Sequence, residues 1–281
     1  MSNEKTDLYY GDFNPNMPCW YQQGCKLQSQ GCKKRCQQYL VMNWLITSCG
    51  KPNAEDYLKT LHPVTKQDLT IFKRLNEIKD NIVDFVQNGN NLYIVSKNLR
   101  NGKTSWAIKL MYRYFDRIWH YCGFTVRGYF IYLPDLITKL KTFSYRETKE
   151  FEVIDHNLKN ADIVIWDDIS SMELTANDQN VLNTYLGLRV QKNLSNIYTG
   201  YYTGDNLNNV IGERLSNRIL NSEIIELTSP SLNAQTLKIM QDAEQAKRTG
   251  VLEEFIKNYQ KKVEQSKNKK SSKKKQEEGE E

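Results

Sequence analysis

The chain has 281 residues, 39% of them hydrophobic and 26% charged. This length suffices for one core of moderate size plus a small extra module. The longest apolar runs are far shorter than the roughly 20 residues of a membrane span, and the first residues lack the apolar core of a secretory signal. We therefore expect a cytoplasmic protein without a membrane partner. Most of the net charge of +6 lies in a lysine-rich C-terminal segment, which argues against a folded body that clamps DNA through bulk charge.

Four of the six cysteines cluster near the N-terminus, at Cys19, Cys25, Cys32 and Cys36. Four thiolates can hold Zn²⁺ in tetrahedral geometry, and a small module with little core gains its folding energy in that way. Their neighbours are polar, whereas free buried cysteines usually have apolar neighbours. We expect a zinc module over residues 1–50, with a short helix over 39–46. Free, reduced thiols are the alternative.

Residues 51–70 are expected to form a linker, although apolar residues at spacings of three and four predict helix over much of 54–90. Beyond residue 90 the period changes, and short apolar runs alternate with helical segments. Strands are predicted at 92–95, 128–133, 163–166, 197–199 and 224–227. Helices are predicted at 103–121, from 134 onward, at 177–191 and at 207–220.

This alternation predicts an α/β domain over residues 71–230, with a mostly parallel sheet that is covered on both faces. A terminal helix is expected over 231–264. Residues 265–281 consist mainly of lysine, serine and glutamate, which predicts a disordered charged tail.

The segment 96–105 follows a predicted strand and opens a predicted helix, as a phosphate-binding P-loop requires. Backbone N–H groups at the start of the helix would face the phosphates. The Lys103 ammonium would reach the β and γ phosphates, the Thr104 hydroxyl would hold Mg²⁺, and Gly102 would let the backbone approach closely. The residues expected to contact the nucleotide are Asn101, Gly102, Lys103, Thr104 and Ser105.

This loop departs from the usual glycine pattern. Lys97 stands where such loops have glycine, and Arg100 stands where they often have another. Lys97 can be accommodated if its φ stays below zero, whereas a positive φ would strain it. On this segment alone, a surface turn that caps a helix is an equal alternative.

A second segment, 163–168, is an apolar strand that ends in two acids. This is the form of a Walker B strand, in which Asp167 helps to hold Mg²⁺ and Asp168 positions or activates the attacking water. The alternative is a pair of acids that leave the strand and cap the next segment. Both motifs in the expected order favour nucleotide binding.

A third segment carries Arg214 and Arg218, four residues apart and hence on one face of a predicted helix. In an oligomeric ATPase, such an arginine can reach the γ phosphate of a neighbouring subunit. On spacing alone, a solvated helix face is the more frequent explanation.

Four segments of the chain carry a resemblance to a known family. In chain order they are Gly102-Lys-Thr104, Tyr132-Leu-Pro-Asp-Leu-Ile-Thr-Lys-Leu140, Ile165-Trp-Asp-Asp168 and Gly212-Glu-Arg-Leu-Ser-Asn-Arg-Ile219. Together they resemble the DnaC/DnaI/IstB group of AAA+ ATPases, which comprises bacterial replicative-helicase loaders and their transposon relatives. The resemblance covers about residues 70–230. The cysteine cluster resembles the N-terminal zinc module of phage-type loaders.

The resemblance implies an AAA+ fold with ATP, Mg²⁺ and Zn²⁺ as cofactors. It implies a DnaB-type replicative helicase and single-stranded DNA as partners, in a bacterial host cell, and self-association through the AAA+ domain. Asp168 and Arg218 become the candidate catalytic residues, with Arg214 beside Arg218. The group usually has asparagine after the fourth strand, where this chain has Tyr201. With the missing glycines, this departure predicts slow ATP hydrolysis.

Two other functions remain open. The chain can be a transposition ATPase of the same fold, although the cysteine-rich N-terminus disfavours this. It can also be a zinc-containing adaptor with a degenerate P-loop that binds its partner without nucleotide.

Overall fold

The computed structural model describes residues 14, 16–19, 21, 25, 32–51, 66–98, 101–142 and 148–228. The chain divides into two compact units, Met1–Pro230 and Ser231–Glu281, and all the described residues lie in the first. The predicted terminal helix and charged tail, and most of the predicted linker, lie outside the described residues. Among the helices that are described, none combines the length and the apolar character needed to cross a bilayer.

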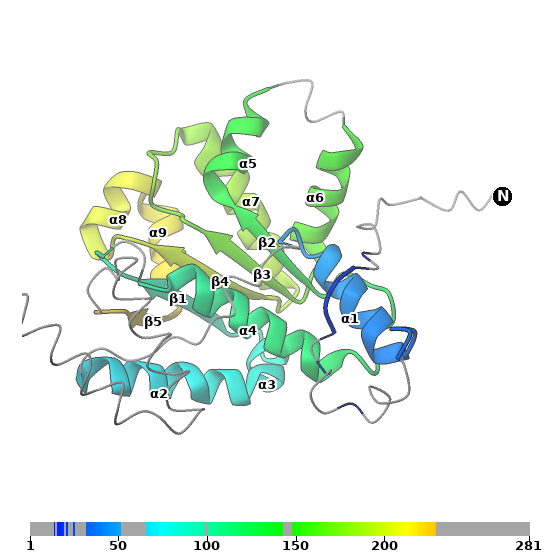
Figure 1. Cartoon of the computed structure of the whole chain (residues 1–281). Coiled ribbons are helices and arrows are strands. Elements are labelled where there is room, and N and C mark those ends of the chain that lie inside the picture. Colours follow the sequence, from blue (N-terminus) through cyan, green and yellow to red (C-terminus); the bar gives the residue numbers. More distant parts are fainter. Residues whose placement is uncertain are drawn as a thin grey trace, which may run out of the picture. The chain divides into compact units, whose positions relative to one another are not determined.

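Five strands form one parallel sheet in the order β2-β3-β4-β1-β5 (Figure 1). Their bounds are β1 Asn91–Val95, β2 Gly128–Tyr132, β3 Ile163–Asp167, β4 Ser195–Gly200 and β5 Glu223–Glu226. All four pairings are parallel, so the predicted α/β class and parallel sheet are confirmed. Because β4 pairs with both β1 and β3, the carboxyl ends of these three strands are neighbours.

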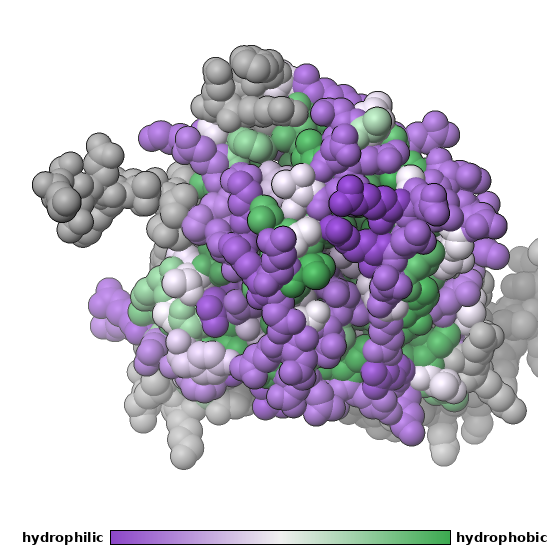
Figure 2. All heavy atoms as spheres, turned by 180° about the vertical axis from the view of Figure 1, so that it is seen from behind, coloured by the Kyte–Doolittle hydropathy of each residue, from purple (hydrophilic) through white to green (hydrophobic). Residues whose placement is uncertain are grey.

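Helices cover both faces of the sheet (Figure 1), because alternate residues of each strand point to opposite sides. On one face, Leu92 and Ile165 pack against the helices α1 (Gln37–Thr47), α2 (Lys66–Asp80), α3 (Ile82–Gln87) and α4 (Lys103–Ile118). On the other, Tyr93 and Trp166 pack against α5 (Leu133–Leu140), α6 (Lys149–Asn160), α7 (Ala176–Gln191), α8 (Gly204–Ile211) and α9 (Glu213–Leu220). The face opposite the view of Figure 1 carries mainly hydrophilic side chains with hydrophobic ones between them (Figure 2).

Helix α1 shares the hydrophobic core of the sheet. Its Leu45 and Ile46 are buried together with residues of α4 and of the strands. Beyond the helix, the Cys49 carbonyl accepts a hydrogen bond of 2.7 Å from the Phe130 backbone N–H of the edge strand β2. The predicted boundary at residue 50 therefore falls inside this packed unit.

Three helical predictions differ from the structure. Within the predicted helix 54–90, the described residues form two helices, α2 and α3, which meet at Asn81. The single helix predicted over 207–220 is wrong, because Gly212, with φ of 85°, separates α8 from α9. The sequence assigned no helix to 149–160, although Thr148 caps α6 and accepts a 3.2 Å hydrogen bond from the Phe151 N–H.

Buried Arg189 joins α7 to the sheet and to the end of α6. Its guanidinium is 0% exposed and donates to the carbonyls of Leu158 and Ala161, both at 2.9 Å, to the Ser195 carbonyl and to Asn196 Oδ1. Burial lowers the pKa of Arg189 to about 10. These four acceptors satisfy a charge that would otherwise be costly to bury.

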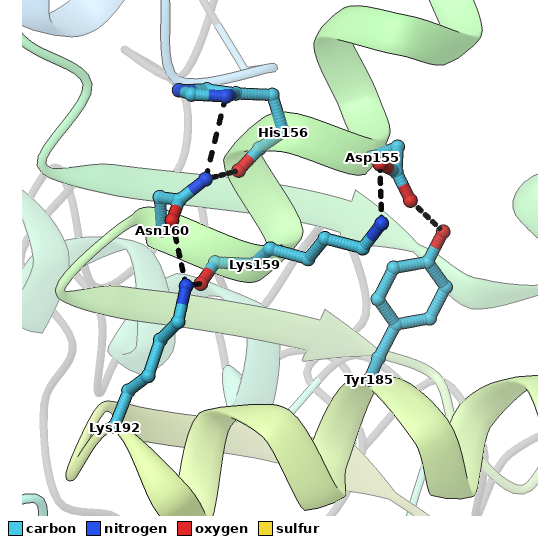
Figure 3. A network of polar contacts seen from close by, with 6 residues as sticks. All are labelled: Asp155, His156, Lys159, Asn160, Tyr185 and Lys192. Carbon is cyan, nitrogen blue, oxygen red and sulfur yellow. Dashed lines mark hydrogen bonds and ion pairs between the residues drawn. The ribbon is translucent and has the colours of Figure 1, made fainter.

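The outer side of the same α6–α7 contact is polar (Figure 3). Lys192 donates to the Lys159 carbonyl at 3.1 Å and to Asn160 Oδ1 at 2.8 Å. Asp155 accepts from Lys159 at 2.6 Å and from the Tyr185 hydroxyl at 2.8 Å. The buried arginine and this partly exposed network thus connect the same pair of helices.

Replacing Arg189 with methionine tests the buried half of this contact. Arg189→Met removes the guanidinium donor from four acceptors, of which Asn196 Oδ1 keeps a hydrogen bond from Trp166 Nε1, and we expect the free energy of unfolding to fall by about 2–4 kcal/mol. Lys192→Met is the matched control, because it removes an exposed cation from the same contact and should cost less than about 1 kcal/mol. Urea unfolding measures both values; equal losses would contradict this account.

Candidate functional site

The loop between β1 and α4 starts as a continuation of the sheet. The Ser96 N–H donates to the Gly200 carbonyl at 3.1 Å. Gly102 closes the loop with a left-handed φ of 97° and caps α4, whose Trp106 N–H donates to its carbonyl at 2.9 Å. Lys97 is exposed and has a negative φ, so lysine fits at this glycine position without backbone strain.

Lys103 opens α4 with its side chain folded into the loop. It is only 8% exposed, and its ammonium donates to the carbonyls of Ser96 at 3.4 Å and Asn98 at 3.1 Å. The same Nζ atom lies 4.2 Å from the centre of the Tyr201 ring. Burial lowers the pKa of Lys103, and the negative charges of Asp168 and Asp167 oppose this effect.

Asn101 ties the loop to the last strand of the sheet. Its side-chain amide donates to Ser96 Oγ and, at 3.3 Å, to the Leu227 carbonyl beyond β5. Its Oδ1 atom is buried and has no hydrogen-bond partner among the described residues. Ser105, the fifth residue predicted to contact the nucleotide, lies half-buried in the first turn of α4.

Asp167 joins the two predicted motifs. Its Oδ1 accepts a hydrogen bond of 2.8 Å from the Thr104 hydroxyl, and one of 2.7 Å from the Thr199 hydroxyl. Burial raises the pKa of this carboxyl although both hydroxyls lower it. An alcohol oxygen and a carboxylate oxygen are ligands that Mg²⁺ accepts. The donor set therefore fits this cation, which Thr104 and Asp167 would hold.

Asp168 leaves β3 in the left-handed region, with φ of 62°. Its backbone N–H donates to the Thr199 hydroxyl at 3.0 Å, and its Oδ2 accepts from the Tyr132 hydroxyl at 3.5 Å. The half-exposed carboxylate of Asp168 thus has a different hydrogen-bond partner from the buried carboxylate of Asp167. A non-glycine residue in this region carries backbone strain, which is frequent at functional sites.

The end of β4 connects these groups, and the sequence did not single out two of its contacts. Thr199 bonds the side chain of Asp167 and the backbone of Asp168. Ser170 accepts a 2.7 Å hydrogen bond from the Tyr201 N–H. The sequence does offer one signal for Thr199, a polar residue near the end of a buried strand. That signal points to the site only once β4 is known to lie between β1 and β3.

The two arginines lie on α9, away from the loop just described. Arg214 is exposed. Arg218 is half-buried and donates to the Asn183 carbonyl of α7 at 3.0 Å. The structure therefore brings the predicted phosphate loop and the acids at the end of β3 together. It places both arginines on α9, with no hydrogen bond or ion pair to either motif among the described residues.

The four N-terminal cysteines do not fit a metal centre as they lie. They are free thiols, and no group of three or more His, Cys, Asp or Glu residues in the described part of the chain could hold a metal ion. Cys36 instead caps α1, accepting a hydrogen bond of 3.4 Å from the Tyr39 N–H. The predicted zinc site thus lacks structural support and remains a prediction from the sequence.

The five-stranded parallel sheet, with the loop that follows β1, can be compared with the folds of known proteins. The crystal structure of the DnaC helicase loader is similar to this chain, with a TM-score of 0.51 and 22% identity over 62% of this chain and 100% of that one. This likeness shows that the chain shares the fold of that structure.

Two further solved structures are more distant. That of DnaI has a TM-score of 0.49 and 16% identity over 62% of this chain and 93% of that one. That of AMPPCP-bound DnaA from Aquifex aeolicus has a TM-score of 0.45 and 16% identity over 68% of this chain and 54% of that one. Neither a family model nor a curated protein matches the chain.

Removing the buried negative charge tests the electrostatics of the site. The folded state raises the pKa of Asp167, so ionisation of this group disfavours folding, and its penalty is fully present above the raised pKa. Asp167→Asn keeps an oxygen acceptor for both hydroxyls. We expect the ligand-free variant to melt several degrees higher than the parent at pH 7, with the difference shrinking as the pH falls toward 4.

Asp168→Asn is the control, because it removes the same charge from a half-exposed neighbour and should change the melting temperature less. Thermal unfolding at several pH values decides the matter. A variant of Asp167 that melts lower than the parent at pH 7 would show that the carboxylate stabilises the folded protein.

Proposed function

We propose that this chain binds ATP with Mg²⁺ at the loop between β1 and α4. The observation that carries the proposal is the 2.8 Å hydrogen bond between Thr104 and Asp167, which brings the first residues of α4 to the carboxyl end of β3. In this arrangement the backbone N–H groups at the start of α4 and the Lys103 ammonium face the phosphates. Asp168 would then be the carboxylate that orients the attacking water.

We further propose that the protein is a helicase loader. The support is its fold, which is that of a protein described as the DnaC helicase loader, together with the motifs in the sequence. On this proposal, a DnaB-type replicative hexamer is delivered to single-stranded DNA during replication of a phage or another mobile element. Exposed Tyr132 and Tyr202, which are 45% and 43% exposed, would offer rings on which bases stack.

Hydrolysis on this proposal is slow and needs a second copy of the chain. Arg218 or the exposed Arg214 of one copy would contact the γ phosphate bound by its neighbour. Slow turnover is supported by the tyrosine at position 201, because its ring lies against the lysine that the phosphates need.

The decisive variant for nucleotide binding is Lys103→Ala. Without the ammonium we expect the Kd for ATP with Mg²⁺ to rise at least about tenfold, which corresponds to about 1.4 kcal/mol, and ATP-dependent recruitment of a DnaB-type helicase to disappear. Lys139→Ala is the control, because it removes the same charge from α5. Calorimetry and a helicase pull-down measure the two effects.

The outcomes separate the three functions. Normal helicase recruitment by Lys103→Ala would contradict a role for the nucleotide. Recovery of a transposase without helicase would favour the transposition ATPase. A parent protein without measurable binding at millimolar ATP would favour the adaptor.

The arginines make a separate prediction about hydrolysis. Arg218→Ala should lower turnover about 10³-fold if it contacts the transferred phosphate, while the Kd for ATP stays within about twofold of the parent value. Arg214→Ala, made alongside it, shows which arginine acts. A parent turnover of tens per second or more, measured by phosphate release, is incompatible with the slow ATPase proposed here.

A further inference from the structure

Tyr201 and Lys103 form a contact at this site that the P-loop pattern does not require. The ammonium of Lys103 lies 4.2 Å from the centre of the Tyr201 ring. This distance is well within the range of a cation–π interaction, which strengthens when the pair is shielded from water. Lys103 is 8% exposed and the tyrosine is half-buried, so the contact is shielded.

The lysine's hydrogen bonds make this contact a competitor of phosphate. An ammonium group has three N–H donors and accepts nothing. The carbonyls of Ser96 and Asn98 engage two of them, and the electron-rich face of the Tyr201 ring takes up another side of the group. A phosphate oxygen that approaches Lys103 must therefore displace the ring or one of the two carbonyls.

The backbone around the ring is held firmly. The Tyr201 N–H donates to Ser170 Oγ at 2.7 Å, and the carbonyl of the next residue, Tyr202, accepts from the buried Tyr93 hydroxyl at 2.6 Å. A Cβ atom on Gly200 would lie 2.5 Å from that hydroxyl, so only glycine leaves it room. With its backbone fixed on both sides, residue 201 can release Lys103 only by rotating its side chain.

We propose that Tyr201 is a positioning residue that holds Lys103 in the nucleotide-free protein and competes with the phosphates for it. This inference rests on the proposed binding of ATP at the same loop and adds a determinant of affinity. The ring, not the hydroxyl, makes the contact. Removing the ring therefore frees the lysine, whereas removing only the hydroxyl leaves it held.

The experiment compares three variants of the full-length chain by calorimetry with ATP and Mg²⁺. Tyr201→Ala should bind ATP at least about threefold more tightly than the parent, the range expected when a cation–π contact no longer has to be broken. Tyr201→Phe should keep the parent Kd within about twofold, because its ring is retained. Tyr121→Ala, which removes an exposed ring beyond the far end of α4, should leave the Kd unchanged.

The results test separately whether Tyr201 competes for Lys103 and whether the protein binds ATP at all. Tighter binding by Tyr201→Ala together with a parent-like Tyr201→Phe supports the inference. Equal or weaker binding by Tyr201→Ala overturns it while ATP binding by the parent stands. A Tyr201→Phe variant that binds as tightly as Tyr201→Ala overturns it too, because the hydroxyl would then be responsible. Absence of binding by the parent and all variants at millimolar ATP overturns both.

Discussion

The buried carboxylate of Asp167 is the point on which the site depends. It accepts hydrogen bonds from Thr104 at the start of α4 and from Thr199 near the end of β4. Three segments far apart in the sequence thereby meet on one atom. Burial works against this charge, as the raised pKa of the carboxyl shows. A cation at the same place would relieve this cost, in keeping with the Mg²⁺ that we propose for the site.

The sheet order explains why β4 matters as much as the two predicted motifs. Since β4 lies between β1 and β3, its last residues touch both sides of the site. Thr199 contacts the acids, and the ring of Tyr201 contacts Lys103. The residues at the end of β4 and just after it thus link the lysine to the acids, and α8 follows them in the chain at Gly204.

Much of this could be predicted from the sequence, because the signals were local. Buried parallel strands appear as short apolar runs, and the order of the motifs gave Lys103, Thr104 and Asp167. The rest depended on tertiary contacts. Helix α6 is an exception, because its apolar residues Phe151, Ile154 and Leu158 at spacings of three and four and its cap at Thr148 are local signals that were missed. The break between α8 and α9 depends on the positive φ of Gly212, which the apolar pattern does not reveal. The contact between Tyr201 and Lys103 joins residues that are far apart in the sequence and that only the sheet brings together.

We propose that the Thr104–Asp167 pair and Lys103 form a site for a nucleotide with its metal. The most direct measurement is calorimetric titration of the parent protein with ATP, once with Mg²⁺ and once with a chelator in its place. We expect saturable binding with Mg²⁺ that weakens at least about tenfold, or by about 1.4 kcal/mol, in the chelator. Equal affinity under both conditions, or no binding with Mg²⁺ at millimolar ATP, would contradict it.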